Sequence, residues 1–179
     1  MNELYEKSLH ILELPAVLAK LAAEAVSEGA KARALALRPA DNAWEVENLQ
    51  RETGDARELI AYKGTPPLSA IKDVSASVGR AKLGGMLNPR ELLDIAALLR
   101  CSRLVSAYGG EAAKTSLYGL FAALRPNRYL EDRINTAIVS EEEIADTASS
   151  ELADIRRHIK VANAKVREIL QRMISSSTT

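Results

Sequence analysis

The chain has 179 residues, with 24 basic and 24 acidic side chains and one cysteine. A formal net charge of zero argues against a strongly basic protein that coats nucleic acid, and one cysteine cannot form an internal disulfide. The opening residues lack the basic flank and apolar run of a signal peptide, and no uncharged stretch is long enough to span a membrane. These features predict a cytoplasmic protein with no membrane segment.

The composition indicates a soluble globular chain built from helices. Hydrophobic residues make up 47% and charged residues 27% of the sequence, which is the usual balance for such a chain. Aromatic residues make up only 4%, whereas a β-sandwich of this length would carry more aromatic and β-branched side chains. We expect an all-α fold, with a multi-helix core bundle followed by one long projecting helix.

The first part of the chain predicts four helices with clear boundaries. Ser27 can cap the third helix, and Pro39 ends it. Asp41 is the expected cap of a long charged helix that stops before the Gly- and Pro-rich segment 64–67. The expected ranges are 3–12, 15–25, 29–37 and 42–62. The inward face of the long helix is expected to hold Trp44, Leu49, Ala56 and Leu59 or Ile60.

Further helical segments follow, each interrupted by glycine or proline. Residues 71–83 form a helical pattern that a Gly-Gly pair ends. Asn88, followed by Pro and Glu at the first and third helical positions, is a strong start signal. Segment 91–105 is apolar on nearly every side, which predicts a helix buried at the centre of the bundle. Two more helices are expected over 111–124 and 129–137.

The period of the apolar residues changes after residue 137. Short apolar runs at 137–139 and 143–145 flank an acidic turn, which favours two short strands in a small β-hairpin. The expected organisation is therefore a helical core domain over 1–137, a hairpin or connector over 138–150, and the beginning of a long helix over 151–179.

That last helix carries a heptad seam, which has apolar residues at alternating spacings of three and four. At 1.5 Å per residue, residues 151–174 extend roughly 36 Å. A seam this narrow favours pairing with a single helix, either from a second copy or from chain beyond Thr179, while the alternative is that it packs on the bundle. The seam residues are Leu152, Ile155, Ile159, Ala162, Val166, Ile169 and Met173.

The same helix is basic within a neutral protein. Residues 151–174 hold six cations and three anions, so their net charge is 6 − 3 = +3. Arg156, Lys160 and Arg167 share one face and could contact nucleic-acid phosphates. A solvated flank of a coiled coil would have the same pattern, so both interpretations stay open.

Two patterns suggest phosphate chemistry, and each has a plainer interpretation. Segment 109–115, GGEAAKT, resembles a P-loop. However, Ala113 stands where Gly must precede Lys and no strand comes before it, so we interpret it as a helix start. His10 could be the phosphorylated histidine of a helical phosphotransfer bundle, although a surface histidine looks the same. Neither His10 nor His158 has partners at metal-ligand spacing.

The remaining candidates also favour structural roles. Cys101 lies in the most apolar helix and is expected to be a core residue. The acidic residues Glu141, Glu142, Glu143 and Asp146 could attract a divalent cation, but they lack the spacing of an EF-hand loop, and an acidic turn is the simpler interpretation. We expect no catalytic residue, metal site or cofactor in this chain.

Two stretches, together with the opening, carry a family likeness. They are 81–95, AKLGGMLNPRELLDI, and 144–157, IADTASSELADIRR, and segments 12–14 and 37–39 add to them. In order and spacing they resemble the N-terminal part of bacterial MutS proteins of the type-two branch. That branch is associated with suppressing recombination rather than with mismatch correction.

The resemblance implies a function for a longer protein. In the family, this region is the helical core, and a lever helix leads from it to a clamp. An ATPase domain using ATP and Mg, and a small nuclease domain, are expected beyond Thr179. The implied protein is a homodimeric ATPase and putative endonuclease that clamps branched or mismatched DNA, or binds ribosomal RNA and rescues collided ribosomes. The alternative is a stand-alone helical module for dimerisation, with no enzymatic activity.

Overall fold

The structure is a computed structural model that describes residues 3–68 and 71–176. Within these ranges it is helical and holds no strand, which confirms the predicted all-α fold. The elements in chain order are α1 (Glu3–Ile11), α2 (Leu14–Ala23), α3 (Glu28–Leu35), α4 (Ala43–Lys63), α5 (Ser75–Lys82), α6 (Pro89–Tyr108), the 3-10 helix η1 (Gly109–Lys114), α7 (Tyr118–Ala122), α8 (Arg128–Ala137), the 3-10 helix η2 (Asp146–Ala148) and α9 (Ser150–Ser176).

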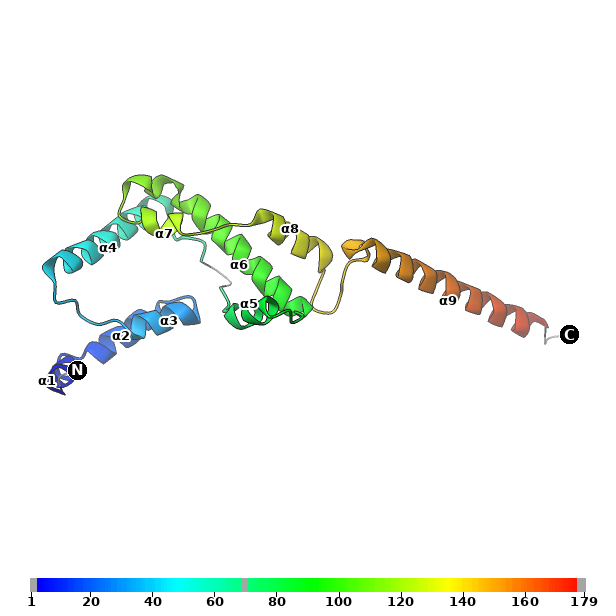
Figure 1. Cartoon of the computed structure of the whole chain (residues 1–179), viewed down its shortest axis with the longest axis horizontal. Helices are drawn as coiled ribbons and strands as arrows, with labels where there is room; N and C mark the ends of the chain where they lie inside the picture. Colours follow the sequence, from blue (N-terminus) through cyan, green and yellow to red (C-terminus); the bar gives the residue numbers. More distant parts are fainter. Residues whose placement is uncertain (1–2, 69–70, 177–179) are drawn as a thin grey trace.

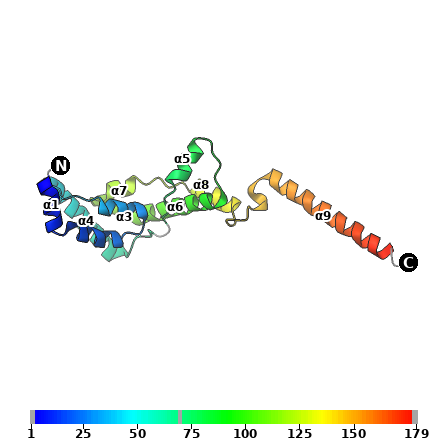
Figure 2. The same ribbon diagram turned by 90° about the horizontal axis from the view of Figure 1, so that it is seen from below.

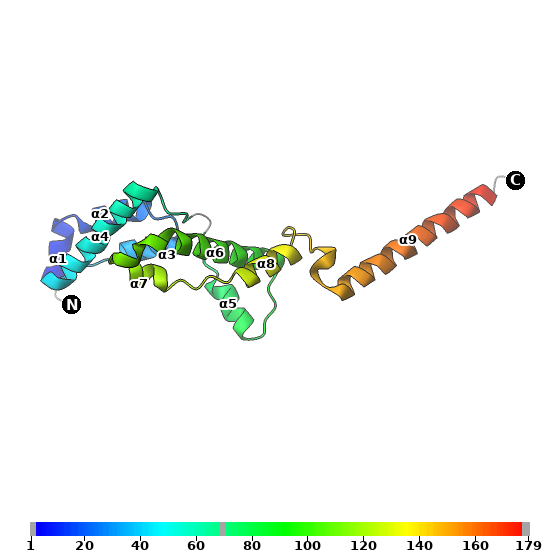
Figure 3. The same cartoon turned by 90° about the horizontal axis from the view of Figure 1, so that it is seen from above.

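The helices form an elongated core from which the last helix projects. The first three helices lie together at one end (Figure 1). The long helix α6 runs through the core with α8 alongside it. Figures 2 and 3, turned by 90° in opposite directions, show that α9 extends away from the core at the opposite end. The arrangement therefore places the two chain ends far apart.

The pairing of α6 with α8 forms the buried core cluster. Ala96 of α6 lies against Ile134 and Ile138, and all three are buried. Arg103 donates from Nε and Nη2 to the two carboxylate oxygens of the buried Glu131, at 2.9 and 2.7 Å. This bidentate ion pair satisfies the hydrogen-bonding capacity of the Glu131 carboxylate where water is largely excluded. Further apolar side chains packed against the cluster are Leu92, Leu93, Ile95 and Ala137.

The second half of α4 is held to the end of α6 by polar contacts. The Tyr108 hydroxyl donates to the Gly64 carbonyl at 2.7 Å, and Lys63 Nζ donates to the Tyr108 carbonyl at 3.1 Å. Asp55 accepts from the backbone N–H and the hydroxyl of Ser116, at 2.7 and 2.6 Å. Because Ser116 turns toward Asp55, the continuous helix predicted over 111–124 is wrong: η1 ends at Lys114, and the short α7 follows after a turn.

Helix starts follow the capping rules, with one correction. Ser27 accepts from the N–H of Ala30, as predicted. Asn88 and Glu91 form the predicted reciprocal capping box, each side chain accepting from the other's backbone N–H, at 2.9 and 3.0 Å. The cap of α4 is Asn42 rather than Asp41. Asn42 has an extended backbone, from which its side chain reaches the N–H groups of the first turn.

Two helices are less enclosed than their sequences suggest. In α4, Trp44 is 72% exposed and Leu49 is 51% exposed, which contradicts the predicted inward face, whereas Ala56 and Leu59 are partly buried. Ala56 and Leu59, in the second half of α4, line a hollow together with residues of α6 and α7. In α6, the described residues that are buried are Ala96 and Cys101, so the predicted central helix is only half covered.

The boundaries of two further segments also differ from the predictions. α5 begins at Ser75 instead of residue 71: residues 71–74 are not helical, and Asp73 accepts from the Ser75 N–H at the start of the first turn. The predicted hairpin is reduced to one antiparallel bridge between Ile138 and Ile144. The chain then passes directly into η2, so no ladder of paired residues forms.

Candidate functional site

The seam of α9 faces solvent along the helix. Ile155, Ile159, Val166 and Ile169 are 48%, 53%, 54% and 42% exposed. A side chain packed on a core would be nearly inaccessible. The seam therefore does not pack on the core helices. Of the other seam residues, Leu152 is half-buried at the base, and Ala162 and Met173 are exposed.

The connector before α9 links this helix to the core. Ile138 at the end of α8 pairs with Ile144, and η2 packs against both α8 and α9. Ser149 caps the first turn of α9: its hydroxyl accepts from the N–H of Leu152 at 3.1 Å, and its carbonyl accepts from Ala153. The base of α9 is thus fastened by backbone as well as side-chain contacts.

A carboxylate in the connector holds two cations of α9, and we call these three residues the Asp146 anchor. Arg156 Nη1 donates a hydrogen bond to the Asp146 carboxylate and a second one, of 2.8 Å, to the carbonyl of Ile144. Lys160 Nζ lies 3.5 Å from the other carboxylate oxygen of Asp146. The hydrogen bond from Arg156 lowers the pKa of Asp146, and the charge of Lys160 acts in the same direction. The Asp146 carboxyl therefore stays ionised at neutral pH.

Two of the three cations on the predicted nucleic-acid-binding face of α9 are paired with a carboxylate of the connector. Arg156 and Lys160 converge on Asp146, while Arg167 lies two turns further along and has no ion pair with a described residue. Phosphate contact by these residues stays a prediction. The sequence by itself indicates Asp146 only as a possible ligand of a divalent cation. Its relation to Arg156 and Lys160, which are one turn apart on the helix, was the signal that sequence reasoning missed.

The other sequence candidates lie apart from this region. Segment 109–114 forms η1 directly after a helix, which is not the strand–loop–helix setting of a P-loop. His10 is exposed in the last turn of α1, and His158 is exposed on α9. Among the described residues, no cluster of His, Cys, Asp or Glu is suited to hold a metal ion.

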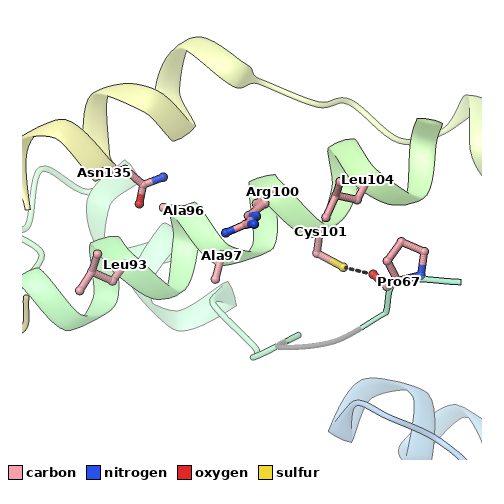
Figure 4. A pocket seen from close by; sticks show the side chains of 8 residues that line it. All are labelled: Pro67, Leu93, Ala96, Ala97, Arg100, Cys101, Leu104 and Asn135. Carbon is pink, nitrogen blue, oxygen red and sulfur yellow. Dashed lines mark hydrogen bonds between the residues drawn. The ribbon is translucent and has the colours of Figure 1, made fainter. Parts of the chain in front are cut away.

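Cys101 is buried beside a hollow of about 310 Å³ between α6, α8 and the segment around Pro67 (Figure 4). Its thiol lies 3.3 Å from the Pro67 carbonyl and donates to it. Burial raises the pKa of the Cys101 thiol, so the reactive thiolate is disfavoured. Arg100 and Asn135 supply the polar part of the lining. The expected structural role of Cys101 agrees with this environment.

Among the helices in the described part of the chain, none combines the length and the apolar character that crossing a membrane requires.

Comparisons with known proteins identify relatives but no matching family model. The chain is 38% identical over 177 residues to "Endonuclease MutS2" of Clostridium beijerinckii, 41% identical to that of Acetivibrio thermocellus and 37% identical to that of Alkaliphilus metalliredigens. These matches cover 96–97% of this chain but only 22–23% of each relative. They confirm the resemblance to the type-two branch: the chain matches one segment of these MutS2 proteins and spans about a fifth of their length.

Proposed function

We propose that this chain is the core and lever of a cytoplasmic, ATP-dependent MutS2-type protein, and that it transmits motion between an ATPase domain and a clamp. One observation carries the proposal: α9 projects from the core with an exposed apolar seam, while its base is held by the Asp146 anchor. The names of the relatives add support, since each is called an endonuclease of the MutS2 type.

A stiff projecting helix converts a small rotation at its base into a large displacement at its tip. α9 has 27 residues, so it is about 40 Å long at 1.5 Å per residue, and a tilt of about 10° moves its tip by about 7 Å. Such amplification requires a base that turns with the core. Arg156 and Lys160 supply that coupling, because both are tied to a connector that also packs on α8.

The proposal assigns binding and chemistry to the rest of the protein. ATP and Mg would bind an ATPase domain outside this chain, and the full protein would act as a homodimer on branched DNA or on ribosomal RNA. Arg167 is the cation of the predicted basic face with no ion pair to a described residue, so it is the first choice for a phosphate contact.

The test is to charge the seam in the full-length protein. Ile159→Asp with Val166→Asp would abolish pairing along α9, because two carboxylates would be buried without partners. We expect ATP-driven retention on closed circular DNA to be lost, while ATP hydrolysis persists. The matched control is Val161→Asp with Ala164→Asp on the opposite side of α9, which should retain DNA normally. Unchanged retention in the seam variant would refute the lever role and favour a stand-alone helical module.

A further inference from the structure

We propose that the turn between α5 and α6 inserts its two exposed apolar side chains, Leu83 and Met86, among unstacked bases where nucleic-acid duplexes branch. We name residues 83–86 the α5–α6 tip. This inference rests on the proposed function and deepens it, because it assigns recognition of the branch point to particular residues of this chain. It is carried by the exposure of the tip, by the contacts that hold it rigid and by the charges around it.

The α5–α6 tip presents apolar side chains to solvent at the end of a projecting element. Leu83 is 90% exposed and Met86 is 92% exposed, more than any other large apolar side chain among the described residues. Figures 2 and 3 show α5 and the turn after it standing away from the line of α6 and α8. Because neither side chain is buried, neither stabilises the fold through burial, and both are free to bury apolar surface against a ligand.

Contacts on both sides of the turn hold the tip in one conformation. The N–H groups of Gly84 and Gly85 donate to carbonyls of the last turn of α5, each at 3.0 Å, in the Schellman arrangement. Arg80 spans the turn: its Nε donates to the Met86 carbonyl at 3.3 Å, and its guanidinium pairs with Glu91 at the start of α6. A rigid tip loses little conformational entropy when it binds.

This geometry requires both glycines. Gly84 has a φ of 81°, in the left-handed region that favours glycine. A Cβ on Gly85 would come within 2.5 Å of Arg80 Cγ and 3.0 Å of the Arg80 carbonyl oxygen, so a side chain there would displace the bracing arginine. The glycine pair also leaves the crest of the turn bare between Leu83 and Met86, which lets its backbone approach a ligand closely.

The charge around the tip favours a polyanion as the ligand. Residues 74–90 contain three cations, Arg80, Lys82 and Arg90, and no acidic residue. Lys82 is exposed and has no ion pair with a described residue. Arg90 lies 3.6 Å from Glu141, and both side chains of this pair are mostly exposed. Because such exposed pairs contribute little, Lys82 and Arg90 can both bind phosphates beside the inserted tip.

Unstacked bases are the part of a nucleic acid that suits these apolar side chains. Leucine and methionine are among the residues that proteins insert as wedges between base steps. In a continuous duplex the wedge must first unstack neighbouring base pairs, which costs free energy, whereas bases that are already unstacked or unpaired require less. The tip therefore discriminates branched from linear nucleic acid, while the cations supply attraction to the phosphates that both kinds share.

The experiment measures binding of the full-length protein, without nucleotide, to a four-way junction and to a linear duplex with the same number of phosphates. Fluorescence anisotropy gives both dissociation constants, and 2-aminopurine beside the branch point reports unstacking by a rise in its fluorescence. Leu83→Ala with Met86→Ala should weaken junction binding about tenfold, as expected for roughly one buried aliphatic side chain. It should also abolish the fluorescence rise, but leave duplex binding unchanged because no charge is removed.

Three further variants separate the contributions to binding. The matched control, Ile11→Ala with Leu12→Ala, removes the same number of heavy atoms from side chains that are 80% and 74% exposed, and should keep the junction preference. Lys82→Ala should weaken junction and duplex binding equally, as expected for a phosphate contact. Gly85→Ala should reduce the junction preference although both apolar side chains remain, because Arg80 is displaced. Circular dichroism checks that every variant keeps the helix content of the parent.

The same junction assembled from DNA and from RNA distinguishes the two sources of this chemistry. A loss at Leu83→Ala with Met86→Ala that is confined to one of them identifies that nucleic acid as the target. A similar loss with both supports recognition of unstacked bases in either.

Three results would overturn the inference: a junction preference that the tip variant retains, an equal loss of junction and duplex binding, or an unchanged 2-aminopurine signal. The first is also the result expected if the tip instead docks on a protein. A parent protein with no preference for either junction would overturn the branched target in the proposed function together with this inference. The lever is tested separately, because retention on circular DNA depends on ATP and these binding measurements do not.

Discussion

Replacing isoleucine by alanine, once in the core and once in the projecting helix, compares how much the two sites contribute to the free energy of unfolding. Ile134 of α8 is 7% exposed and lies in the core cluster, whereas Ile159 of α9 is 53% exposed. Both lie within helices, so the substitution changes helix propensity by the same small amount, about 0.4 kcal/mol in favour of alanine. The two variants therefore differ mainly in how much apolar surface each side chain buries.

The expected magnitudes follow from that difference. Ile134→Ala removes three buried carbons, which costs about 2.4 kcal/mol at about 0.8 kcal/mol per methylene. Incomplete collapse of the cavity brings the expected loss in free energy of unfolding to about 3 kcal/mol. For a chain of this length, that lowers the Tm by about 6 to 12 °C. Ile159→Ala removes the same atoms from an exposed site, so we expect a change within about 0.5 kcal/mol.

Urea unfolding followed by far-UV circular dichroism measures both free energies on the same chain. The measurement is repeated at several protein concentrations, because pairing of α9 between copies would make the stability depend on concentration. A loss at Ile159→Ala as large as that at Ile134→Ala would refute the reasoning, since it would mean that the seam is buried in solution. Equal and small effects at both sites would instead contradict the packing of α8 on α6.

Two further predictions concern charged groups. In Asp146→Asn, Arg156 loses its ionised partner. We therefore expect the distribution of distances between spin labels on α8 and α9 to broaden, while helix content is unchanged. A distribution as narrow as in the parent would show that the anchor does not orient α9. Hydrogen bonds from Arg80 and the Asn88 N–H lower the pKa of Glu91 from 4.5 to about 2. Because this pKa is lower in the folded chain, the charge of Glu91 stabilises the fold fully above about pH 4.5, and this contribution is lost as the pH falls toward 2. The stability difference between the parent and Glu91→Gln should therefore shrink over that range; parallel pH profiles would contradict this assignment.

The helical fold could be predicted because its signals are local. Ser27 and the Asn88–Glu91 pair cap their helices through contacts within four residues. The seam of α9 is likewise a matter of spacing along one helix, and its register can be read without knowing what surrounds it. A prediction from local signals was wrong where a contact with a distant residue competed. Ser116 donates to Asp55 of another helix, and the helix predicted over 111–124 is interrupted there.

The candidate site could likewise be predicted only in part. Its cations could be named from the sequence, because Arg156, Lys160 and Arg167 recur on one helical face. Their partner could not, because Asp146 lies on a different element, and only the turn through η2 brings it to the side of α9. The exposure of Trp44 could not be foreseen either, since the apolar face of a helix does not reveal whether another element reaches it.

By itself, the sequence determined which segments are helical, where most of them begin, and that the last helix offers a narrow apolar seam with basic flanks. These properties depend on propensity, capping and periodicity within a short stretch of chain. Only the tertiary structure decided that α8 buries its Glu131 against Arg103, and that α9 leaves the core with its seam exposed. Those outcomes depend on which segments, distant in the sequence, come into contact, because the burial of a side chain depends on the surface that covers it as well as on the side chain itself.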